Sequence, residues 1–89
     1  MRQFEICVFH EVGLHARPAA QFVQAASQFN SEIKVRNKTL NSDWVNAKSI
    51  LGILTLGVEV DHWIELLIEG EDELQAVEAI TGLVESNFP

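Results

Sequence analysis

Residues 3–29 read QFEICVFHEVGLHARPAAQFVQAASQF, and their hydrophobic pattern changes period halfway along. Residues 3–9 alternate, and both sides are fairly apolar because Phe4, Ile6 and Val8 lie on one side and Cys7 and Phe9 on the other, which predicts a central β-strand. After Pro18 the apolar residues recur at helical spacing, which predicts a helix with one apolar face. Pro18 suits the first turn of that helix, where its missing N–H costs no hydrogen bond. The stretch therefore predicts a strand, a break at Gly13 and then a helix.

The rest of the chain continues this mixture of strands and helices. Alternating residues predict strands at 32–36, 39–45 and 63–69. A short helix is predicted between Ser49 and Gly57. The apolar face of a last helix carries Leu74, Val77, Ile80 and Val84. The order β-α-β-β-α-β-α contains one pair of adjacent strands, so we expect an α+β fold whose antiparallel or mixed sheet has helices on one face.

Length and charge limit the possible functions. With 89 residues and a net charge of −7, residues 1–89 are predicted to be one small acidic domain, which excludes multi-domain enzymes and α/β barrels. A chain this acidic is not expected to bind nucleic acid, because phosphate neutralisation supplies most of that affinity. The acids at 71–73 are expected in the first turn of the last helix, where the helix dipole favours them. Basic residues lie mainly in the first half, so any anionic group should bind there.

Cysteine usage and hydropathy indicate the compartment. The single cysteine, Cys7, cannot form an internal disulfide or a thiolate metal site. No apolar run approaches the roughly 20 residues that span a bilayer, and the N-terminal residues lack the apolar core of a signal peptide. We therefore expect a cytoplasmic protein that does not insert into membranes.

The segment Gly13-Leu14-His15-Ala16-Arg17-Pro18-Ala19 carries the strongest chemical signal. His15 directly precedes the predicted helix, whose first N–H groups have no partner within the helix. Such a helix start binds phosphate through these N–H groups and the positive end of its dipole. Arg17 adds donors that match phosphate oxygens, Gly13 permits a tight backbone approach, and a histidine ring can carry a covalent group. The pattern indicates phosphoryl transfer, although such a histidine is more often a cap or a surface residue.

The same segment resembles the active-site signature of HPr, the histidine-containing phosphocarrier family of the bacterial phosphoenolpyruvate:sugar phosphotransferase system. A second segment, NAKSILGILTLG at residues 46–57, resembles the regulatory serine of that family and the short helix after it. The resemblance covers essentially the whole chain in length and element order. It implies an open-faced β-sandwich, in which a four-stranded antiparallel sheet carries three helices on one face.

The resemblance also implies a role for each matching residue. His15 would accept the phosphoryl group on Nδ1 from Enzyme I and pass it to EIIA proteins. Arg17 and the backbone of Ala16 and Arg17 would steady the phosphate. Ser49 would be phosphorylated by the ATP-dependent HPr kinase, and a transcriptional regulator would be a further partner. The protein would be a carrier and not a free-standing enzyme, and it would act as a monomer without a cofactor.

The helix after Ser49 is too apolar for its length. Ser49 is in the capping position, which by itself accounts for a serine there. At helical spacing Ile53 and Leu56 suit the inside, so the other apolar positions would be partly exposed and could mark a partner site. The partner-binding positions that the resemblance implies are Ala20, Gln24, Ile50, Leu51 and Leu54.

Two alternatives from other functional classes remain open. The first is an HPr-like regulatory binding module that acts through the surface of the Ser49 helix without phosphotransfer. The second is a small ligand-binding α+β domain, which predicts a concave apolar pocket. That alternative gives no reason for His15 and Arg17 to lie together, so their presence favours the carrier.

Some features depart from the family pattern or lie outside it. Residues 41–44 look like a short insertion that lengthens a turn. Where many members carry basic residues on the first helix, this chain has Gln21, Gln24, Ser27 and Gln28. His10 and His62 have acidic neighbours, but their spacing matches no metal-ligand pattern, so we expect surface histidines and no metal site.

Overall fold

The computed structural model describes all of residues 1–89. Its elements follow the predicted order β-α-β-β-α-β-α. They are β1 (Arg2–Val8), α1 (Ala16–Ser27), β2 (Glu32–Asn37), β3 (Val45–Asn46), α2 (Ile50–Thr55), β4 (His62–Glu69) and α3 (Glu73–Glu85). No helix combines the length and the apolar character that crossing a membrane requires.

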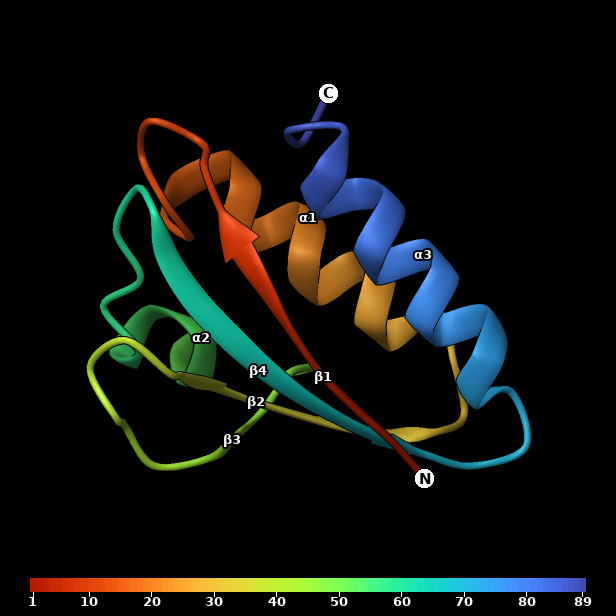
Figure 1. Cartoon of the computed structure of the whole chain (residues 1–89). Coiled ribbons are helices and arrows are strands. Elements are labelled where there is room, and N and C mark those ends of the chain that lie inside the picture. The colour runs from red at the N-terminus through yellow and green to blue at the C-terminus, as the bar shows by residue number, and fades with distance from the viewer.

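The strands form one antiparallel sheet in the order β1-β4-β2-β3. β4 pairs with both β1 and β2, so the longest strand is a central one. α1 and α3 lie side by side on one side of the sheet, and α2 contacts α1 and β3 (Figure 1). The α+β open-faced β-sandwich expected from the sequence is therefore confirmed.

β1 lies at an edge of the sheet, and the prediction that it is central is wrong. Its only sheet neighbour is β4. Val8 is fully buried in the core, whereas Cys7 on the other side is half-buried opposite Trp63. Phe9, which extended the apolar pattern in the sequence, follows the end of the strand and is exposed. The apolar residues on the second side of β1 therefore make their contacts on the open face of the sheet.

The core fills the space between the sheet and the helices. The fully buried residues of β4 alternate as the sequence predicts and are Ile64, Leu66 and Ile68. From the helices, Phe22 of α1 and Ile80 of α3 are also fully buried. Leu74 was expected on the apolar face of α3 but is 52% exposed, and Ala76 is buried instead. The helical face that meets the core is thus rotated away from Leu74.

The start of α3 also differs from the prediction for the acids at 71–73. Because α3 begins at Glu73, only that acid lies in the first turn. The Asp72 carboxylate instead accepts hydrogen bonds from the Ser31 hydroxyl and from the backbone N–H groups of Asn30 and Ser31. These donors hold the pKa of Asp72 below its usual range, the Ser31 hydroxyl contributing most. Asp72 therefore ties the start of α3 to the connection between α1 and β2.

A loop joins β2 to β3, and most of the strand predicted at 39–45 is absent. Only the two residues of β3 pair with β2. Asn41 has a positive φ of 54°, and its side-chain oxygen accepts a hydrogen bond from Arg36. The Arg36 guanidinium lies 5.3 Å from the ring centroid of Trp44. Side-chain contacts and local backbone hydrogen bonds from Asn41 and Ser42, rather than sheet pairing, therefore hold the loop that contains residues 41–44.

Candidate functional site

His15 occupies the N-cap position of α1. Its backbone is extended, with φ −130° and ψ 162°, and its side chain makes no capping hydrogen bond. The residue is half-buried, so part of the ring faces solvent. Most N-cap side chains accept a hydrogen bond from the first turn. The imidazole of His15 is not used in this way, which leaves its nitrogens available to a ligand.

The loop before His15 rests on the segment that precedes β4. The backbone N–H of Leu14 donates to the carbonyl of Val58 at 3.0 Å. Gly13 has a φ of +66°, and a Cβ added there would lie 2.0 Å from the Val58 oxygen. The tight approach expected at Gly13 is therefore an approach to the backbone of Val58. It fixes the position of the chain two residues before His15.

The first residues of α1 leave backbone donors free. Ala16 has a positive φ of 52°, a conformation that costs a non-glycine residue about 1–2 kcal/mol. Pro18 has no N–H, so the free donors that follow the cap are those of Ala16 and Arg17. Both residues are exposed, at the positive end of the dipole of a 12-residue helix. This arrangement suits an anion beside His15.

Arg17 and two predicted partner-binding residues lie on one face of α1. Arg17, Ala20 and Gln24 are all exposed and have helical spacing. None of the ion pairs in the protein involves Arg17. Gln21, by contrast, is half-buried and donates to the backbone oxygen of Pro89 at 2.8 Å. Gln21 therefore does not belong to the exposed face of α1, although the sequence pattern grouped it with Gln24, Ser27 and Gln28.

Ser49 caps α2, as the sequence predicts. Its side-chain oxygen accepts a hydrogen bond from the backbone N–H of Gly52 at 3.1 Å. Ile53 and Leu56 are buried, which confirms the predicted inner face. The exposed apolar residues of α2, which we call the α2 patch, are Ile50 at 41%, Leu51 at 73% and Leu54 at 41% exposure. Because α2 contacts α1, the patch and the exposed face of α1 lie on neighbouring elements.

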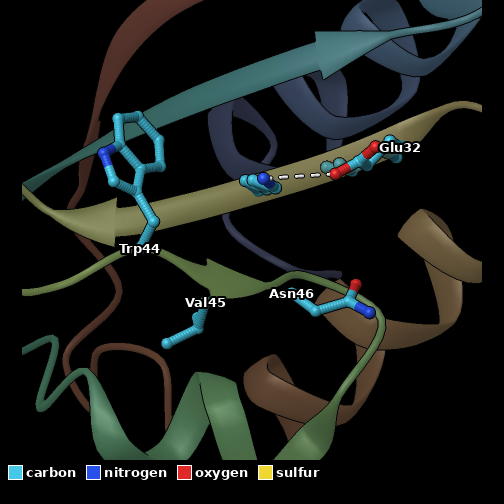
Figure 2. Close-up of a pocket in the computed structure, with 6 residues that line it drawn as sticks. Glu32, Trp44, Val45 and Asn46 are labelled. Carbon is cyan, nitrogen blue, oxygen red and sulfur yellow. Dashed lines mark ion pairs between the residues drawn. The ribbon is translucent and has the colours of Figure 1, made fainter.

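The grooves on the surface of the protein lie away from the predicted site residues. A groove of about 320 Å³ is lined by Glu32, Ile33, Lys34, Trp44, Val45 and Asn46 (Figure 2). A smaller one of about 200 Å³ shares Glu32 and Lys34, which form an ion pair at 3.2 Å. Neither groove includes a predicted site residue, and charged side chains line both. The concave apolar pocket that a ligand-binding domain predicts is not found beside His15.

The two other histidines are built into the fold, and neither is a simple surface residue. The ring of His10 accepts a hydrogen bond from the backbone of Val12 and meets the ring of Phe88 edge-on. Nδ1 of His62 accepts from the backbone N–H of Glu59. No group of three or more potential metal ligands occurs anywhere in the chain.

Sequence reasoning missed a polar cluster on the open face of the sheet. The Glu65 carboxylate is nearly buried and accepts hydrogen bonds from Gln3 at 2.7 Å and Arg36 at 2.8 Å. These two hydrogen bonds, that of Gln3 first, hold the pKa of Glu65 below its usual range. Lys38 lies 3.9 Å from the same carboxylate. A charged residue within the alternating β4 pattern was the only sequence signal for this cluster.

Comparison with known proteins places the chain. The family model described as PTS HPr component phosphorylation site matches residues 2–86. This chain belongs to the HPr family. The phosphocarrier protein HPr of Treponema pallidum (strain Nichols) is 43% identical over 81 residues, which are 91% of this chain and 89% of that protein. The crystal structure of HPr-C-His from Thermoanaerobacter tengcongensis has a TM-score of 0.93 and 46% identity, covering 99% of this chain and 96% of that one.

A larger HPr relative shows the same domain in another setting. The multiphosphoryl transfer protein of Haemophilus influenzae (strain ATCC 51907 / DSM 11121 / KW20 / Rd) is 44% identical over 71 residues, or 80% of this chain. The match spans only 14% of that protein. HPr is the phosphocarrier family of the sugar phosphotransferase system, so phosphoryl transfer is the function class of this chain.

Proposed function

We propose that this protein accepts a phosphoryl group on His15 from phospho-Enzyme I and passes it to EIIA proteins. The observation that carries the proposal is the uncapped, half-exposed imidazole at the start of α1. Next to it in the chain are the free N–H groups of Ala16 and Arg17, and the Arg17 guanidinium has no ion-pair partner in the chain. A nucleophilic ring and an anion-binding helix start therefore occupy the same place.

The chemistry is an exchange of one bond to phosphorus for another. Nδ1 of His15 attacks the phosphorus of the donor, and the new N–P bond forms as the donor's bond to phosphorus breaks. The free backbone donors and Arg17 then face the phosphoryl oxygens. An exchange of the same kind with an EIIA protein returns the ring to its free state. Because no groove surrounds His15, the partner supplies the other walls of the reaction site, which suits a carrier rather than a free-standing enzyme.

We further propose that phosphorylation of Ser49 by HPr kinase controls docking. The serine lies at the start of α2, next to the α2 patch. A phosphate adds a charge of about −1.5 to −2 there, which would oppose an acidic or apolar partner surface. In this proposal Enzyme I, EIIA proteins and a transcriptional regulator dock on the α2 patch together with Ala20 and Gln24. Residues 1–89 would act as one domain, as a monomeric cytoplasmic shuttle.

Intact-mass spectrometry tests the proposal after incubation with phosphoenolpyruvate, Mg²⁺ and Enzyme I of the same host. We expect one acid-labile phosphoryl group on the protein. His15→Ala should abolish it and leave the fold intact, because the side chain makes no capping bond. His10→Ala is the matched control, since it removes a half-buried histidine that precedes His15 in the same loop, and it should still be labelled.

Two outcomes would contradict the proposal. Labelling that persists in His15→Ala would place the phosphoryl group on another residue. No adduct on the wild-type chain would remove phosphotransfer altogether, and the regulatory module acting through the Ser49 helix would become the better explanation.

A further inference from the structure

The side chain of Asn37 joins three elements in the interior. Asn37 ends β2 and is fully buried. Its Nδ2 donates to the carbonyl of Leu56 at 3.0 Å and lies 3.2 Å from Nδ1 of His62, while its Oδ1 accepts from the backbone N–H of Leu40 at 3.1 Å. Leu56 is the C-cap of α2, and His62 begins β4. One carboxamide therefore connects β2, the end of α2 and the start of β4.

Nδ1 of His62 faces two hydrogen-bond donors. One is Nδ2 of Asn37, and the other is the backbone N–H of Glu59 at 3.1 Å. Neither an amide NH₂ nor a backbone N–H can accept, so Nδ1 must carry a lone pair and the ring proton must be on Nε2. The backbone N–H of His62 also donates to the Glu59 carbonyl at 3.1 Å. His62 thus closes the turn from Glu59 through both its backbone and its side chain.

The turn that His62 closes directly follows Val58, the residue that binds the loop before His15. Val58 directly precedes Glu59 and accepts the hydrogen bond from Leu14, the residue before His15. Both Val58 and Leu14 are fully buried. The backbone of Gly13 also packs directly against the Val58 carbonyl, since a Cβ added at Gly13 would lie 2.0 Å from that oxygen. A displacement of Val58 is therefore transmitted to His15.

We propose that His62 and Asn37 are positioning residues for the His15 site. Neither touches the reacting atoms. Together they hold the Val58–Glu59 segment where Leu14 can bind it, and this sets the position of the imidazole at the start of α1. The kinetic consequence rests on the proposed function of His15, whereas the structural step can be measured without any phosphotransfer.

The protonation pattern of His62 is tested first on the chain without any substitution. Nitrogen NMR shifts at neutral pH should show Nδ1 of His62 without a proton and Nε2 with one. A proton on Nδ1 would overturn the proposal, because that nitrogen could then accept from neither Asn37 nor Glu59.

Three variants separate positioning from general stability. His62→Phe keeps a ring but removes the acceptor, whereas the side-chain oxygen of His62→Asn can replace Nδ1 as an acceptor. Thr39→Val is the matched control, since Thr39 Oγ1 accepts from the backbone N–H of Trp63 at 2.8 Å and has no bond to Glu59. We compare hydrogen exchange of the Leu14 amide with that of Ile80 in the core of α3.

In His62→Phe, exchange at Leu14 should rise about 5-fold relative to Ile80, the factor expected for loss of the hydrogen bond that the Glu59 N–H donates to His62. The maximal rate of phosphorylation by Enzyme I should fall by a similar factor or more, with an unchanged KM because the α2 patch is intact. His62→Asn should restore both the exchange ratio of Leu14 to Ile80 and the maximal rate of phosphorylation. Thr39→Val should change neither of them.

Equal Leu14 exchange in His62→Phe and Thr39→Val would refute positioning, and so would failure of His62→Asn to restore it. If His62→Phe does not fold, His62→Asn with wild-type exchange still supports the proposal, and His62→Asn with raised exchange contradicts it. A wild-type chain that is never phosphorylated on His15 would instead refute the proposed function, and the exchange results would still decide the structural step.

Discussion

Replacing Gly13 by alanine should be far more costly than replacing Gly57, although both glycines have positive φ. At +66° and +60° the two backbones impose nearly the same conformational cost on alanine, about 1–2 kcal/mol. The surroundings differ. A Cβ at Gly57 meets only the end of the Leu40 side chain at 3.9 Å, which is ordinary contact. A Cβ at Gly13 lies 2.0 Å from the Val58 oxygen and 2.9 Å from the Glu59 Cα.

The clash at Gly13 cannot be relieved by a side chain, because the obstructing atoms belong to the backbone. The Val58 oxygen must retreat to at least about 3.0 Å from the new Cβ, and we expect its hydrogen bond from the buried N–H of Leu14 to break. A buried donor without a partner costs about 1–3 kcal/mol. Together with the backbone conformation, we expect Gly13→Ala to lower the free energy of unfolding by about 2–5 kcal/mol and Gly57→Ala by about 1–2 kcal/mol.

Urea unfolding of three variants measures this difference. Gly82→Ala provides the opposite control, because Gly82 lies within α3 with nothing within 4 Å, and alanine there should stabilise by about 0.5–1 kcal/mol. All three substitutions restrict the unfolded chain alike, so differences between them report the folded state. A Gly13→Ala variant within about 0.5 kcal/mol of Gly57→Ala would refute the reasoning, because the close approach to Val58 would then be absent.

Two further predictions concern Ser49 and Glu65. Ser49→Ala should lower the free energy of unfolding by about 1 kcal/mol, while Ser49→Asp should retain the cap. If urea titration showed the same loss of stability in both variants, the result would argue against the hydrogen bond from Gly52. Because hydrogen bonds from Gln3 and Arg36 lower the pKa of folded Glu65, its stabilising effect is present above the ordinary glutamate value of about 4.3 and is lost as pH falls through the lowered value. Glu65→Gln should therefore destabilise at neutral pH and weaken the acid dependence of unfolding; an unchanged dependence between pH 5 and 2 would contradict this role of Glu65.

The elements that local periodicity defines were predictable from the sequence. Alternation placed Ile64, Leu66 and Ile68 in the core, and helical spacing separated Ile53 from the exposed residues of α2. Ser49 was recognised as a cap because a serine before an apolar run has few other local roles. Each of these inferences depends only on residues a few positions apart, and tertiary contacts left them intact, whereas they overrode the same kind of local pattern at Leu74 and at residues 39–45.

Strand order was not predictable in the same way. An apolar residue on the second side of a strand can contact a neighbouring strand or a covering layer, and the sequence does not distinguish them. In β1 the relevant neighbour of Cys7 is Trp63, which lies opposite it on the adjacent strand β4. The indole and Phe9 both remain half-exposed, so the apolar character of this side does not mark the centre of the sheet.

In the candidate site too, some residues could be predicted from local sequence pattern, and others depend on tertiary contacts. His15 and Arg17 could be proposed from the sequence because phosphoryl transfer at a helix start requires a fixed local arrangement. Asn37 and His62 are 25 positions apart and look like ordinary turn residues in the sequence. Antiparallel pairing of β2 with β4 brings the ends of those strands together, and only then does a buried amide meet an imidazole acceptor. The residues that we propose for the chemistry can thus be found from local pattern, whereas the residues that we propose to position them follow from the register of the sheet.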